Sequence, residues 1–144
     1  MDLLRLYDYA EQHDIRVDWL PMQMAQSLSI QLTDGTCAVA LDPWQLSTSS
    51  DEKVKLAHEL GHCETGSFYN IHAPCDVRQK HENRADKWAI KELIPEDELN
   101  KAVSHGITEI WDLAEHFGVT EDFMRKAVCW YTHGTLDTDR YFIT

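Results

Sequence analysis

The stretch that decides the fold of this 144-residue chain is His58-Glu59-Leu60-Gly61-His62. It reads H-E-x-x-H, in a segment whose pattern predicts a helix from the loop at residues 47–51 to about residue 64. On a helix the two histidines lie on one face, about one turn apart, so both imidazole rings can reach the same ion. Glu59 lies at the edge of that face, where its carboxylate can hold a water molecule beside the ion. The motif predicts His58 and His62 as metal ligands and Glu59 as a catalytic base.

A second segment, beginning twenty positions after His62, carries two carboxylates with the same spacing. Glu82 and Asp86 are four residues apart in a predicted helix over residues 82–93, so both carboxylates point the same way. A catalytic zinc commonly has two histidines and one glutamate as ligands and keeps its fourth position for water. Glu82 is therefore predicted as the third ligand. Asp86 is predicted to accept the other N–H of a ligand histidine, namely His58.

A plainer interpretation stays open for each pair. Glu82 and Asp86 could be ordinary members of a solvated helix face, and the two histidines could be a structural pair without a metal. The two patterns occur together at a suitable interval, and the small side chains of Ala85 and Ala89 would let the helices approach closely. This combination favours one zinc ion.

The rest of the chain predicts an α+β layout. Strand patterns cover residues 15–19, 27–33 and 36–41, and Asp34-Gly35 marks a hairpin turn between the last two. Helical patterns outside the two motif segments cover residues 2–13, 96–104, 108–117 and 120–132. Residues 66–80 read as irregular. The predicted order is a helix, a short antiparallel sheet, the two motif helices and then the C-terminal helices, in one domain over residues 1–144.

The charge of the chain bears on its partners. The formal net charge is −12, from 13 basic and 25 acidic side chains. A uniformly acidic surface repels phosphate, which disfavours nucleic acid as a partner. The net charge is −7 over residues 1–52, +2 over residues 53–91 and −7 over residues 92–144. Two acidic arms therefore flank a middle segment that contains every predicted metal ligand.

The chain has neither a secretory signal pattern nor an apolar run of about 18 residues, so we expect a cytoplasmic protein that does not enter a membrane. Its four cysteines form no C-x-x-C pair, and reduced thiols are the expectation for that compartment. A Cys63–Cys75 bridge is the alternative. Cys63 is turned about 100° from the ligand face and is expected to be a packing residue. Cys75 lies between the ligand helices and could approach the metal.

The arrangement resembles the gluzincin metallopeptidases of thermolysin type, and more closely the small ImmA/IrrE family. In that family a helix with H-E-L-G-H precedes a helix of the form E-x-x-A-[ND]-x-[FW]-A-x-x-L-[LI]-P. The matching text here is Glu82-Asn83-Arg84-Ala85-Asp86-Lys87-Trp88-Ala89-Ile90-Lys91-Glu92-Leu93-Ile94-Pro95. Residues 110–120 are also similar to the C-terminal helical part of that family. The segment after Tyr131 matches no pattern.

The resemblance implies a small zincin-like domain that hydrolyses peptide bonds with zinc, Glu59 moving the proton. It also implies a cytosolic bacterial protein, often from phage or mobile elements, that acts as an anti-repressor on a helix-turn-helix repressor. The acidic arms suit such a basic partner. Oligomeric state stays open. So does the group that stabilises the oxyanion, for which the candidates are Tyr69, His72, His81, His116, Tyr131 and His133.

Two rival functions remain. Residues 113–126 read like a helix-turn-helix, but the second helix opens with Glu121 and Asp122, which favours packing helices over a DNA reader. The second rival is a non-catalytic, zinc-containing regulatory or protein-binding module. Structural zinc sites are usually closed by four protein ligands, often cysteines, whereas three ligands are predicted here.

Overall fold

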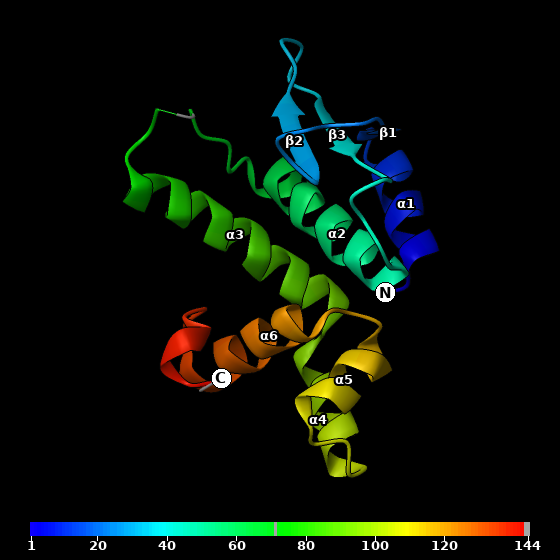
Figure 1. The fold of residues 1–144 in the computed structure, drawn as a ribbon, viewed down its shortest axis with the longest axis vertical. Coiled ribbons are helices and arrows are strands. Elements are labelled where there is room, and N and C mark those ends of the chain that lie inside the picture. Colours follow the sequence, from blue (N-terminus) through cyan, green and yellow to red (C-terminus); the bar gives the residue numbers. More distant parts are fainter. Residues whose placement is uncertain (71, 143–144) are drawn as a thin grey trace.

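The computed structural model describes residues 1–70 and 72–142 of the chain. Helix α1 (Leu3–Gln12) precedes strands β1 (Arg16–Trp19), β2 (Ser27–Gln31) and β3 (Cys37–Leu41). The remaining elements are helices α2 (Ser49–Thr65), α3 (Cys75–Leu93), α4 (Glu96–Ser104), α5 (Ile110–Phe117) and α6 (Glu121–His133), and the short 3₁₀ helix η1 (Thr138–Arg140). The sheet, α1 and α2 lie at one end of the molecule, α4, α5 and α6 lie at the other, and α3 runs between them (Figure 1). The predicted α+β class is confirmed.

The sheet is mixed, which corrects the expected antiparallel sheet. The strand order is β1-β3-β2, with β2 antiparallel and β1 parallel to β3. The hairpin at Asp34-Gly35 is as predicted, and Gly35 supplies the positive φ of its turn. β3 takes the centre because its Cys-Ala-Val-Ala-Leu run is the most apolar of the three strands and suits burial between two neighbours. β1 is then left to pair with the other side of β3.

The hairpin register decides which face of β2 meets α2. Ser27 pairs with Leu41 and Ser29 pairs with Val39, both of which are buried on the α2 side of the sheet. Side chains alternate along a strand, so Ser27 also points toward α2 while Leu28 points away and stays exposed. The edge strand thus presents a hydroxyl to the H-E-x-x-H helix.

Helix α2 spans the predicted segment. The Thr48 side chain accepts a hydrogen bond from the backbone N–H of Asp51 and caps the first turn. At the other end, Gly66 adopts the left-handed conformation that commonly terminates a helix.

Helix α3 begins at Cys75, seven residues before the predicted start at Glu82. The expected irregular stretch is therefore shorter, and residue 71 within it lies outside the described residues. The early turns of α3 project beyond α2 and are largely exposed, so they carry no apolar periodicity to mark a helix. Pro74 directly before the helix is compatible with a helix start.

Helices α2 and α3 cross in close contact at Gly61 and Ala85. A Cβ atom built on Gly61 would lie 2.6 Å from the backbone oxygen of Ala85 and 3.0 Å from its Cα. The predicted role of a small residue at the crossing is confirmed for Ala85, and Ala89 is fully buried on the same helix. Gly61 is the residue that sets the closest approach.

We expect the substitution Gly61→Ala to destabilise the protein by about 1–3 kcal/mol or more, because a methyl group there meets rigid backbone. Intrinsic helix propensity alone would give the opposite sign, a gain of about 1 kcal/mol. Urea unfolding followed by circular dichroism measures the difference. A variant as stable as the wild type, or more stable, would contradict the close crossing.

The C-terminal helices attach to α2 and α3 through apolar packing and through hydrogen bonds. The largest fully buried side chains of the core come from both ends of the molecule and include Leu41, Leu56, Leu60, Ile90, Leu93 and Met124. Lys53 of α2 donates a hydrogen bond from Nζ to the carbonyl of Phe117 at the end of α5 (2.6 Å). Tyr131 of α6 donates to the carbonyl of Ile94 (2.7 Å).

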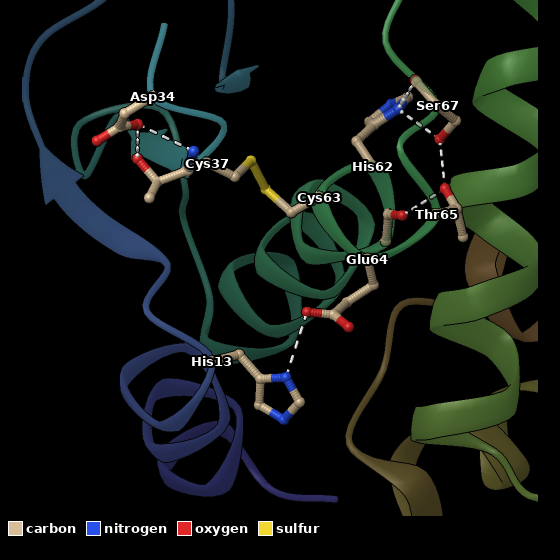
Figure 2. The surroundings of a disulfide bond; sticks show 10 residues. His13, Asp34, Cys37, His62, Cys63, Glu64, Thr65 and Ser67 are labelled. Carbon is tan, nitrogen blue, oxygen red and sulfur yellow. Dashed lines mark hydrogen bonds and ion pairs between the residues drawn. A yellow bond between two sulfur atoms is a disulfide. The ribbon is translucent and has the colours of Figure 1, made fainter. Parts of the chain in front are cut away.

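Cys37 of β3 is bonded to Cys63 of α2, which corrects both expectations for the cysteines. Cys63 faces the sheet while its neighbour His62 points the other way, toward Ser67 (Figure 2). The bond closes a separation of 26 residues. In the chain-entropy model such a loop stabilises the fold by about 3.5 kcal/mol. Cys75 and Cys129 are free thiols.

The tail after Tyr131 first continues α6 and then forms η1, and its last two residues lie outside the described ones. Within residues 1–70 and 72–142, none of the helices combines the length and the apolar character needed to cross a membrane.

Candidate metal centre

Three side chains from two helices converge where α2 crosses α3. His58 and His62 of α2 and Glu82 of α3 each offer one donor atom, and these atoms lie within 4.8 Å of one another. Glu82 Oε2 is 2.7 Å from His58 Nε2, and Glu82 Oε1 is 3.2 Å from His62 Nε2. The two Nε2 atoms are 3.2 Å apart. The structure thus brings together the three residues that the sequence predicts as ligands.

The geometry and chemistry of these donors suit a small divalent metal ion. Zinc binds imidazole nitrogen and carboxylate oxygen at about 2.0–2.1 Å, which places neighbouring ligands of a tetrahedron roughly 3.3 Å apart. The two histidine Nε2 atoms, 3.2 Å apart, are close to that value. The two oxygens of Glu82 lie one against each histidine, at 2.7 Å from His58 Nε2 and 3.2 Å from His62 Nε2. Two nitrogens and one oxygen also form the donor set of an open site with three protein ligands.

Each histidine is oriented through its other ring nitrogen. His58 Nδ1 lies 2.7 Å from Asp86 Oδ1, and His62 Nδ1 lies 2.6 Å from the carbonyl oxygen of Ser67. A carbonyl oxygen only accepts hydrogen bonds, so Nδ1 of His62 carries the proton and Nε2 presents its lone pair to the metal position. Figure 2 shows His62 directed toward Ser67. Ser67 has no sequence signature, because every residue has a carbonyl.

The charges of the centre follow from its hydrogen bonds. Burial alone would lower the pKa of His58, but hydrogen bonds to Asp86 and Glu82 raise that pKa to about 10. Burial alone would raise the pKa of Glu82, but the contacts of its carboxylate with His58 and then His62 hold it well below its usual value. Burial also opposes ionisation of Asp86, and hydrogen bonding to His58 outweighs it and lowers that pKa. Both carboxylates are therefore ionised at neutral pH, as metal binding requires.

Glu59 is buried beside the donor atoms, and a residue of the sheet holds its carboxylate in place. The residue has a relative exposure of 6%, and its Oε2 accepts a hydrogen bond from the hydroxyl of Ser27 at 2.6 Å. Ser27 is the first residue of the edge strand β2, and its side chain faces α2. A single serine at a strand start gives no signal in the sequence, so this partner was not predicted.

The centre lies between two hollows in the surface. A cleft of about 870 Å³ has walls from β2, α2, α3 and α6, and a pocket of about 290 Å³ is lined in part by Leu28, Phe68 and Tyr69. Four residues line both of them, namely Ser27, His58, Glu59 and Glu82. An extended peptide that ran from one hollow to the other would pass the donor atoms and Glu59.

Of the six candidates for oxyanion stabilisation, Tyr69 lies at the centre. Its hydroxyl donates to Glu82 Oε1 at 2.8 Å, and its ring lines the smaller pocket. Burial, helped by Glu82, raises the pKa of Tyr69 to about 12, so the hydroxyl stays protonated and can donate. His81 stacks on the Tyr69 ring, with 6.0 Å between ring centroids.

The other four candidates lie in different surroundings. Tyr131 donates to a carbonyl in the core, as described above. His116 packs against Phe117, and His133 stacks on Tyr141. His72 is exposed in the loop before α3.

Cys75 does not lie among the donor atoms. It is exposed and begins α3, about two helical turns before Glu82. Cys63 is held in its bond to Cys37 on the side of α2 opposite to His62 (Figure 2). Neither the Cys75 thiol nor the disulfide sulfur of Cys63 is placed to act as a ligand.

Comparison with known protein families gives a match over most of the chain. A model of a peptidase family, described as the IrrE N-terminal-like domain, matches residues 10–128. The match includes both predicted ligand helices and most of α6. No curated protein and no solved structure shows significant similarity.

Proposed function

The chain belongs to the peptidase family of the IrrE N-terminal-like domain, and from this premise we propose that it is a zinc metallopeptidase with one zinc ion held by His58, His62 and Glu82. The observation that carries the proposal is the convergence of these three donors beside the buried carboxylate of Glu59. Asp86 orients His58. We further propose one domain over residues 1–144 and a cytoplasmic location, in which the bond between Cys37 and Cys63 would be an exception to the reduced state of most thiols there.

The residues of the centre divide the work of peptide hydrolysis. A bound zinc ion would supply positive charge that polarises the scissile carbonyl and favours the ionisation of water. Glu59 accepts the proton of the attacking water and returns it to the leaving amine. The hydrogen bond from Ser27 fixes one oxygen of this carboxylate, and the second oxygen can exchange the proton. Tyr69 supplies a hydroxyl donor beside Glu82.

We propose a basic helix-turn-helix repressor as the substrate, so that the protein acts as an anti-repressor. The support is electrostatic. The lining of the large cleft includes Asp51 and Asp122, one from each acidic arm of the chain, and Asp122 is paired with Arg125. Acidic side chains outnumber basic ones in the cleft by five to three, and the whole chain has a net charge of −12. This excess of negative charge attracts a basic partner and raises its rate of encounter at low ionic strength.

The test is incubation of the zinc-loaded protein with a repressor encoded beside its gene. We expect discrete cleavage products on mass spectrometry, no products with Glu59→Gln, and slower cleavage at high salt. An acidic, unfolded protein such as casein serves as the control substrate. If the repressor stays intact and repression is not relieved, the proposed substrate is wrong. If casein is cleaved and the repressor is not, the protein is a peptidase but the repressor is not its substrate.

A further inference from the structure

Asp86 is held on both carboxylate oxygens by groups from different helices. Its Oδ1 lies 2.7 Å from His58 Nδ1 of α2, and its Oδ2 lies 3.0 Å from Lys126 Nζ of α6. Asp86 itself has a relative exposure of only 7%. A continuous path of polar contacts therefore runs from α6 through Asp86 to a metal-ligand histidine.

The buried carboxylate of Asp86 needs a cationic partner. An ionised carboxylate out of contact with water is costly unless it is paired. A histidine that binds a metal is neutral. A neutral His58 donates its Nδ1 proton to Asp86 but supplies no charge to balance the carboxylate. Lys126 is then the positive charge in contact with Asp86.

We propose that Lys126 is a positioning residue of the metal centre, acting through Asp86 to hold His58 in the orientation that presents Nε2 to the metal. The inference rests on the proposed metal site. It makes α6 part of that site, although no residue of α6 is a predicted ligand. Lys126 also lines the large cleft, so α6 borders both the metal centre and the path to it.

The chain offers a matched control for this lysine. Lys87 of α3 places its Nζ 4.5 Å from the ring centre of Trp130 in α6, so it also links α3 to α6. Substituting either lysine removes one cationic contact between the same two helices. Of these two lysines, Lys126 is the one that contacts Asp86. A comparison of Lys126→Met with Lys87→Met thus separates support of Asp86 from general docking of α6.

The measurement is the zinc dissociation constant of each purified protein, from competition with a chromophoric chelator. Loss of an outer partner of a ligand costs about 10- to 100-fold in metal affinity, and we expect Lys126→Met to lie near the lower end. Lys126→Arg keeps the charge and should restore affinity to within about threefold of the wild type. Lys87→Met should bind zinc like the wild type. Circular dichroism of each metal-free variant checks that it is folded.

A double-mutant cycle tests the path through Asp86. In an Asp86→Asn background, Lys126→Met should change the zinc affinity by less than about twofold, because the group it supports is already gone. The inference is wrong if Lys126→Met binds zinc like the wild type, if Lys87→Met weakens binding equally, or if the loss is undiminished in Asp86→Asn. If the wild-type protein binds no zinc, the proposed metal site and this inference are both wrong.

Discussion

Replacing Glu59 with glutamine is expected to lower kcat for peptide hydrolysis by about 10²- to 10⁴-fold, the usual contribution of a positioned general acid–base. Glutamine has nearly the same shape and its amide oxygen can still accept the hydrogen bond from Ser27, so the fold should be unchanged. It cannot take the proton from water. Because Glu59 is not one of the three donors, the variant should keep its zinc.

Activity and zinc content are measured on the same samples, with Glu64→Gln as the matched control. Glu64 lies on the same helix, where it faces His13 instead of the metal centre. We expect wild-type activity and zinc content from this control. Full activity of Glu59→Gln with zinc bound, or an equal loss in Glu64→Gln, would remove Glu59 from its proposed role.

Replacing His62 with alanine is expected to weaken zinc binding by on the order of 10²- to 10³-fold, since a total binding free energy of about 10–16 kcal/mol is shared among the ligands of a zinc site. Activity should be lost with the metal. The carbonyl of Ser67 also loses its buried partner.

Zinc titration against a competing chelator measures the loss, with His116→Ala as the control. His116 packs against Phe117 on α5, away from the donor atoms, and its replacement should leave zinc affinity unchanged. If His62→Ala binds zinc as tightly as the wild type, the metal is held elsewhere.

The predicted ligands could be identified from sequence because helix geometry fixes side chains four positions apart on one face. Both pairs lie in segments of clear helical pattern. To predict one site from them, it was enough to assume that the two helices pack together. The structure supplies that contact at Gly61 and Ala85. The partnership of Asp86 with His58 follows from the same two faces.

The groups that hold this set in place could not be found in the same way. Ser27, the carbonyl of Ser67 and Lys126 reach the centre from a strand, a loop and a distant helix. Their pairing depends on tertiary structure, and none has a local pattern of spacing. The bond between Cys37 and Cys63 likewise depends on how β3 lies against the last turn of α2.

The pairing of β1 and the start of α3 were not predicted from the sequence for similar reasons. A period of two predicts that a segment is a strand but does not say which neighbour it pairs with, so the parallel pairing of β1 was not foreseen. The first turns of α3 are exposed and carry no apolar face.

The central claim is one zinc ion on three protein ligands, and an anomalous difference map from a crystal of the zinc-loaded protein tests it most directly. We predict a single peak about 2.0–2.2 Å from His58 Nε2, His62 Nε2 and one carboxylate oxygen of Glu82, with the fourth position free of protein. A peak at any other place, or a fourth protein ligand closing the site, would contradict the claim. The closed site would favour a non-catalytic zinc module instead.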